Sequence, residues 1–140
     1  MTLSDLQSFL DAIPLHRTQP LKAVALNTEA ETVQIKLSWR PEYGNSLGIM
    51  HGGVIATLID TTAACALLTR GRRAGPTINL RVDYLKAIRE GTDVIAEGKV
   101  RRSGRTLAFV DVEVRDDDQA LYALGRANYV AEPVDLSRSA

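Results

Sequence analysis

The sequence predicts an α+β fold in which an antiparallel sheet of about six strands wraps around one long central helix. The helix is predicted by residues 54–68, which are apolar or small apart from Asp60, because a helix that is apolar on every face has to be buried. The sheet is predicted by segments on both sides of this helix, in which apolar and polar residues alternate.

The first predicted element is a short amphipathic helix. Residues 4–7 fit a capping box with Ser4 as the cap, and apolar residues then recur at helical spacing until Pro14. Residues 21–39 change to an alternating pattern around a polar turn, which predicts a β-hairpin. Residues 40–50 contain proline, glycine and asparagine, and we expect them to be irregular.

Four further strands are predicted after the central helix. Residues 71–76 are expected to end the helix, and residues 78–84 alternate as a strand with one face inward. Short turns join the later strands, which favours an antiparallel sheet, and one sheet around one helix leaves a flank open for a second copy of the chain. Residues 1–131 are expected to form one domain and residues 132–140 a flexible tail. The last strands are expected near residues 93–102, 105–115 and 120–130.

Composition argues against several classes of function. The 140-residue chain has 17 Lys and Arg against 17 Asp and Glu, so no excess charge favours nucleic acid or an anionic membrane. Cys65 is the only cysteine, which rules out an internal disulfide and suits a reducing cytoplasm. The N-terminus lacks a signal-peptide pattern, and the apolar run is shorter than the ~20 residues that span a bilayer. We expect a soluble cytoplasmic protein without nucleic-acid or membrane partners.

Two features of the central helix suggest a reactive site. His51-Gly52-Gly53 would leave bare backbone N–H groups at the helix N-terminus, where glycine lets a ligand approach and the donors can stabilise an oxyanion. Asp60 is a carboxylate in a mostly apolar segment, which is costly unless it has a partner or a task. A carboxylate in such surroundings is a stronger base.

The spacing of these residues resembles that of the hotdog-fold acyl-CoA thioesterases, specifically the PaaI-like branch. Asn45 lies six residues before His51, and Asp60 lies seven residues after Gly53. Residues 75–80 and 103–109 are similar to further stretches of that family, and the resemblance covers about residues 20–131.

The resemblance implies hydrolysis of an acyl-CoA thioester to a free acid and coenzyme A, in a pocket between subunits. It implies no metal and no cofactor apart from the coenzyme A of the substrate. Asp60 would be the nucleophile or the general base, the Gly52 N–H would polarise the thioester carbonyl, and Asn45 would place the thioester or the water. His51 would hold the turn or assist nearby. Thr77 takes a position where the family often has a small hydroxyl residue, commonly serine, and its role stays open.

Helix geometry adds an expectation of its own. Gly52 and Asp60 are eight residues apart, which separates their backbones by ~12 Å along a helix at ~1.5 Å per residue. A water held by Asp60 has to lie within ~3–3.5 Å of the carbonyl carbon. We therefore expect a homodimer with antiparallel helices and two shared sites, an inactive monomer, and either a dimer or a homotetramer as the final assembly.

Substrate contacts are also expected. Gly53 and Met50 should border the ligand, and apolar residues such as Leu47, Ile49 and Leu58 should line a pocket for an apolar or aryl acyl group. The arginines that flank the turn at residues 103–104 are expected either to bind the phosphates of coenzyme A or to form a solvated hairpin tip. These arginines are Arg101, Arg102 and Arg105.

Other interpretations remain open at the level of sequence. Asp60 could be a satisfied buried residue, His51 a helix cap, and Asn45 part of a plain turn. A hotdog hydratase or dehydratase would usually need a catalytic histidine, and a non-catalytic acyl-thioester-binding module would be expected to lose its carboxylate. Cys65 is best explained as a small core residue.

Overall fold

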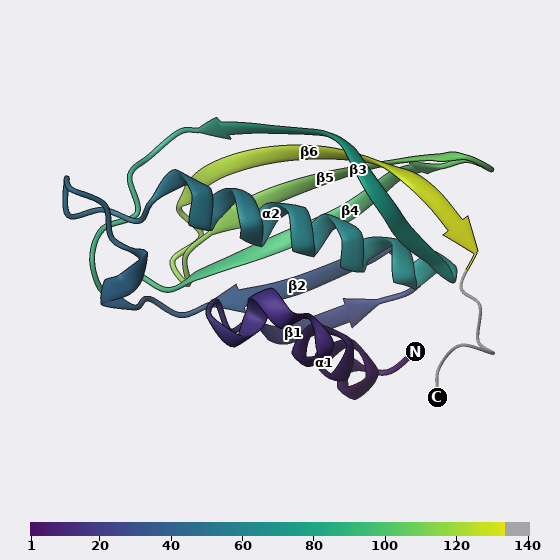
Figure 1. Cartoon of the computed structure of the whole chain (residues 1–140), viewed down its shortest axis with the longest axis horizontal. Helices are drawn as coiled ribbons and strands as arrows, with labels where there is room; N and C mark the ends of the chain where they lie inside the picture. Colours follow the sequence, from purple (N-terminus) through teal and green to yellow (C-terminus); the bar gives the residue numbers. More distant parts are fainter. Residues whose placement is uncertain (134–140) are drawn as a thin grey trace.

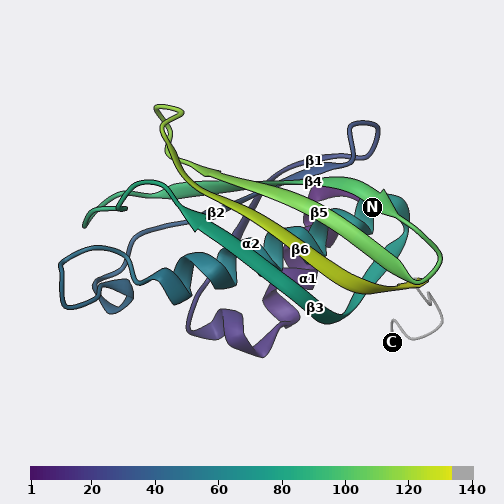
Figure 2. The same ribbon diagram turned by 90° about the horizontal axis from the view of Figure 1, so that it is seen from above.

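The computed structural model describes residues 1–133 and has one long helix, α2 (Gly52–Ala66), lying against one curved six-stranded sheet (Figure 1). The strand order is β1-β2-β4-β5-β6-β3, and every neighbouring pair is antiparallel. Figure 2 shows the strands passing over α2 when the molecule is seen from above. The expected α+β fold is therefore confirmed. The strands are β1 (Lys22–Asn27), β2 (Thr32–Leu37), β3 (Arg72–Tyr84), β4 (Val94–Ser103), β5 (Leu107–Arg115) and β6 (Leu121–Pro133).

The expected N-terminal helix is present as α1 (Leu3–Ala12), which packs on β1. Its cap is Thr2 rather than Ser4. The Thr2 hydroxyl accepts a hydrogen bond from the Asp5 N–H at 3.1 Å, and the Thr2 N–H donates to the Asp5 carboxylate at 2.7 Å. A charged carboxylate is a strong reciprocal acceptor at a helix N-terminus, so the helix starts earlier than expected. A short turn, η1 (Pro14–Arg17), follows.

The central helix begins at Gly52 with His51 as its cap, and its α-helical part ends at Ala66 before a single tight turn, η3 (Leu67–Arg70). Seven of its residues are buried against the sheet, Cys65 among them, while Asp60 and the rest of that flank are half-buried. By length and composition, Gly52–Arg70 could cross a membrane, but here it forms the core of the fold. The open flank is the one expected from a single sheet around a single helix.

The predicted helix stop at residues 71–76 is only partly right, because β3 already starts at Arg72. Gly75 and Pro76 are accommodated by shifts in the register against β6, between Ala74 and Thr77 and between Thr77 and Asn79. Such bulges let a strand pass residues that cannot keep a regular ladder.

β3 is also less buried than its alternating pattern predicted. Leu80 and Val82 pack against the core, but Ile78 and Tyr84 are 55% and 53% exposed. Within residues 1–133, β3 pairs only with β6, so its other edge is unpaired.

The C-terminal boundary also differs from the expectation. β6 extends to Pro133, so the first two residues of the expected tail belong to the sheet. Residues 134–140 lie outside the described part of the chain.

Candidate active site

The carboxylate of Asp60 is held by hydroxyl groups from two neighbouring strands. The Tyr129 hydroxyl, on β6, lies 2.7 Å from the Asp60 main-chain oxygen and 2.9 Å from its Oδ1. The Thr77 hydroxyl, on β3, donates to the same Oδ1 at 3.2 Å. Thr77 and Tyr129 are direct partners in the β3–β6 ladder, which places both hydroxyls beside one turn of α2.

The two hydroxyl groups differ in their surroundings. Tyr129 is 1% exposed, and its burial, followed by the charge of Asp60, raises its pKa far above the usual tyrosine value. It therefore stays protonated and remains a donor. Thr77 is exposed on the edge strand. Within residues 1–133, the second oxygen of Asp60, Oδ2, has no hydrogen-bond partner.

The N-terminus of α2 carries the other predicted group. The His51 Nδ1 accepts the Gly53 N–H at 2.9 Å, so His51 is a helix cap and the Gly53 donor is occupied. The Gly52 N–H has no partner among the described residues. Tyr84 lies directly over Gly52 and donates its hydroxyl to the Gly52 carbonyl at 2.7 Å. A Cβ at position 52 would come within 3.2 Å of the Tyr84 ring, so a larger residue there would require the Tyr84 side chain to shift.

Asn45 lies next to this helix terminus in the loop that precedes it. Its side-chain oxygen accepts the Leu47 N–H at 2.9 Å, as the plain-turn interpretation required. Its amide NH₂ has no partner within the described chain and remains available as a donor. Asn45, Met50 and Gly52 line a single hollow of about 300 Å³.

One chain does not bring the two groups together. Asp60 does not line the hollow that contains Asn45 and Gly52. Because both residues belong to the same helix, the eight-residue separation amounts to ~12 Å along its axis. The structure therefore keeps two groups of residues apart. The group of Asp60, Thr77 and Tyr129 is called the acid half-site below, and the group of Gly52 and Asn45 is called the donor half-site.

The expected lining is partly right. Ile49 and Met50 border the donor hollow, whereas Leu47 is 77% exposed outside it and Leu58 is fully buried in the core. A loop residue can point to solvent and a helix residue to the sheet without any signal in the local pattern.

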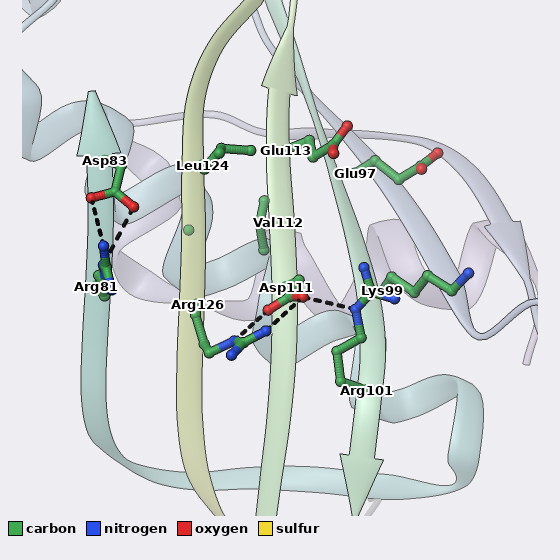
Figure 3. A pocket seen from close by; sticks show the side chains of 11 residues that line it. Arg81, Asp83, Glu97, Lys99, Arg101, Asp111, Val112, Glu113, Leu124 and Arg126 are labelled. Carbon is green, nitrogen blue, oxygen red and sulfur yellow. Dashed lines mark hydrogen bonds and ion pairs between the residues drawn. The ribbon is translucent and has the colours of Figure 1, made fainter. Parts of the chain in front are cut away.

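The three arginines do not reach the donor hollow in this chain. Figure 3 shows Arg101 on the outer face of the sheet, where it bonds Asp111 at 2.8 Å next to Arg126. This outer hollow, of about 480 Å³, is lined mainly by charged side chains of β3 to β6. Arg102 and Arg105 are exposed near the β4–β5 turn. Among the residues that line the donor hollow, the cation is Lys86.

Comparison with known proteins identifies the family of the chain. The family model described as Thioesterase superfamily matches residues 47–123, which is more than half of the chain. The chain belongs to the thioesterase superfamily. The matched segment contains Gly52, Asp60 and Thr77.

Two curated relatives show how far the similarity extends. Human acyl-coenzyme A thioesterase 13 is 35% identical over 74 residues, which cover 52% of this chain and 53% of that protein. The match thus spans about half the length of that relative. A putative esterase of Saccharolobus solfataricus is 32% identical over 104 residues, with 74% of both chains covered.

Solved structures confirm the hotdog fold. Zebrafish thioesterase superfamily member 2 has a TM-score of 0.82 at 25% identity and covers 93% of this chain and 98% of its own. Escherichia coli PaaI has a TM-score of 0.79 at 19% identity, with 95% and 96% covered. A Streptococcus mutans protein bound to acetyl CoA has a TM-score of 0.76 at 23% identity, with 82% and 90% covered.

Sequence reasoning missed the two tyrosines. Tyr84 and Tyr129 occur in ordinary strand patterns, and no motif marks them. The available signal is chemical: a tyrosine on an inward strand position has to find a partner for its hydroxyl. Which partner it finds depends on the β3–β6 register.

Proposed function

We propose that this protein is an acyl-CoA thioesterase, which hydrolyses an acyl- or aryl-CoA thioester to the free acid and coenzyme A. The observation that carries the proposal is that α2 holds two different reactive groups at two places along its length. Within residues 1–133, the Gly52 N–H at the N-terminus of α2 has no partner and Gly52 lines a hollow, while Asp60 in the middle of α2 has one carboxylate oxygen without a partner. The names of the relatives support the same activity.

The proposed chemistry uses these groups directly. The thioester carbonyl oxygen accepts the Gly52 N–H, which stabilises the negative charge that develops as the carbonyl carbon is attacked. In the general-base route, water attacks this carbon while its proton passes to Asp60 Oδ2. The C–S bond then breaks, and the thiolate of coenzyme A leaves and takes up a proton. In the nucleophilic route, Asp60 attacks instead and water hydrolyses the resulting anhydride.

We propose that each site is shared between two chains. The acid half-site of one chain and the donor half-site of its partner would meet if the two α2 helices pack antiparallel. Within residues 1–133 one edge of β3 is unpaired, which supports this pairing, because an edge of this length offers ladder partners to a second copy. The assembly is then a homodimer with two equivalent sites, or a homotetramer built from such dimers.

The walls of the donor hollow suggest the class of acyl group. Ile49, Met50, Ile55 and the ring of Tyr84 make it mostly apolar, which suits an apolar or aryl acyl chain. Lys86 is the nearest candidate for a phosphate of coenzyme A in the same chain. Arg102 and Arg105 would have to serve the site of another chain. We expect the enzyme to work in the cytoplasm, where a buried single cysteine is stable.

A hydratase or dehydratase is less well supported. His51 uses Nδ1 as a helix cap, and the side chains that hydrogen-bond to the Asp60 carboxylate within residues 1–133 are those of Thr77 and Tyr129.

A thiol-release assay tests the proposal. Acyl-CoAs of graded chain length and aryl-CoAs are supplied to the wild type, to Asp60→Asn, and to Asp83→Asn as a control on the outer face. We expect the wild type to release thiol, Asp60→Asn to lose at least about 100-fold in kcat, and Asp83→Asn to match the wild type. The absence of turnover with every thioester would overturn the proposed function in favour of a binding module. After a single turnover in ¹⁸O water, label in Asp60 would establish the nucleophilic route, because only water attack on the aspartyl carbonyl of the anhydride can place label there.

A further inference from the structure

We propose that Tyr129 is a positioning residue that holds Asp60 through Oδ1 and leaves Oδ2 as the reacting oxygen. This inference rests on the proposed thioesterase function. It assigns a role to a buried tyrosine on β6 that touches no part of the donor hollow.

The first support is the double contact of one hydroxyl. The Tyr129 oxygen is 2.7 Å from the Asp60 main-chain oxygen and 2.9 Å from Oδ1 of the same residue. A group that contacts both ends of one residue fixes its side chain relative to the helix axis. Because the ring itself is 1% exposed, close packing prevents the hydroxyl from moving away.

The second support is that the hydrogen bonds to the Asp60 carboxylate fall on only one of its two oxygens. Thr77 and Tyr129 both contact Oδ1, and within the described residues neither oxygen has any further donor. The Thr77 hydroxyl donates to Oδ1, and Tyr129 shares its one hydroxyl hydrogen between Oδ1 and the Asp60 main-chain oxygen. Together they orient the carboxylate plane and leave Oδ2 without a hydrogen-bond partner within residues 1–133. When a proton passes to Oδ2, Oδ1 remains an acceptor, so both contacts survive the transfer.

The third support is that the Tyr129 hydroxyl keeps its proton and therefore remains a donor. Burial and the neighbouring carboxylate keep Tyr129 protonated, and the backbone amide of Ala64 also faces its oxygen. The hydroxyl thus bridges the Asp60 turn of α2 to the β6 strand. Loss of the hydroxyl should disturb the orientation of the carboxylate and leave the substrate hollow, which lies at the helix N-terminus, unchanged.

Tyr129→Phe tests the assignment, with Tyr122→Phe as the matched control. Tyr122 is on the same strand, is also buried, and donates to the Asp116 carboxylate at 2.9 Å. Lys86 of the donor hollow lies over the Tyr122 ring, and the phenylalanine of Tyr122→Phe keeps that ring. We expect kcat for thioester hydrolysis to fall about tenfold to a hundredfold in Tyr129→Phe, as for a lost hydrogen bond to a charged group. KM should change by less than about twofold, and Tyr122→Phe should leave both constants at the wild-type level.

The same substitution in an Asp60→Asn background separates positioning from a structural effect. If Tyr129 acts through Asp60, it should not lower the residual rate further. An equal proportional loss in both backgrounds would mean that the substitution reduces the amount of folded enzyme, and it would overturn the assignment. If Tyr129→Phe fails to fold by circular dichroism, Thr77→Val tests the same Oδ1 contact from the exposed edge strand, and an unchanged kcat there would overturn it.

Failure of this inference is distinct from failure of the proposed function. An active wild type with an unaffected Tyr129→Phe variant removes only the role of Tyr129. A wild type that hydrolyses no thioester removes both.

Discussion

Mixing two inactive variants, Asp60→Ala and Asn45→Ala, should restore activity if each site draws its acid from one chain and its donors from the other. We expect this recovery because Gly52 and Asp60 of one chain are ~12 Å apart along α2. One thioester cannot contact both groups over that distance. In a mixed dimer, one site combines both defects, and the other combines the intact Asp60 of one chain with the intact Asn45 of its partner. Each mixed dimer therefore has one working site.

The expected size of the recovery follows from random pairing. Equal amounts of the two variants, unfolded together and refolded, give about half mixed dimers, so about a quarter of all sites are intact. Thiol release should rise from the background of either variant to about a quarter of the wild-type rate. Separate refolding followed by mixing without subunit exchange serves as the control. A co-refolded mixture that stays at the mean of the two variants would refute the shared site, because a site within one chain always retains one defect.

Four other outcomes are expected. Gly125→Ala should lower the free energy of unfolding by about 1–3 kcal/mol, because a Cβ there would collide with Ile59. Urea titrations of Gly125→Ala with and without Ile59→Ala check this, and the loss of free energy should be smaller in the Ile59→Ala background. Cys65 should resist iodoacetamide at pH 8 until the protein is unfolded, because burial raises the pKa of its thiol to about 12, and rapid labelling of the folded protein would contradict its core position. Hydrogen bonding from Arg126 lowers the pKa of the Asp111 carboxyl below 3.8, so its stabilisation should be complete above that pH and fade as the pH falls further. The stability gap between the wild type and Asp111→Asn, measured in urea at pH 7 and pH 3, should therefore narrow at pH 3. The fourth outcome is that a cysteine introduced at position 56 cross-links the two subunits, as expected from the geometry of α2.

Much of the fold could be predicted because its signals are periodic and local. The apolar run of the central helix and the alternation of the later strands indicate their elements directly. The start of β3 could not be predicted this way, since Gly75 and Pro76 give the local signal of a break. Only pairing with β6, more than fifty residues later in the chain, carries the strand past them through bulges.

Part of the candidate site has a local signal in the sequence. The spacing of Asn45, Gly52 and Asp60 predicts a site, and the structure places Asn45 and Gly52 at one hollow. Tyr129 could not be found in the same way, because its role depends on being opposite Thr77 in a non-local ladder. The direction of Arg101 depends on the strand register as well, and it places that side chain beside Asp111.

The geometry of α2 also locates the symmetry axis of the proposed dimer. In a two-fold pair, a contact from Asp60 to the partner's Gly52 is repeated from Gly52 to the partner's Asp60. The two-fold axis of such a pair passes beside Ala56, which is midway between Gly52 and Asp60. Ala56 is four residues from each of them and therefore lies on the same face of the helix as both. A small side chain at that point lets the two backbones approach closely. With Cys65 replaced by alanine, a cysteine at Ala56 should therefore be joined to its own copy by a short bismaleimide. A cysteine at Thr69, about 20 Å further along the chain's axis from the midpoint, should not react in this way.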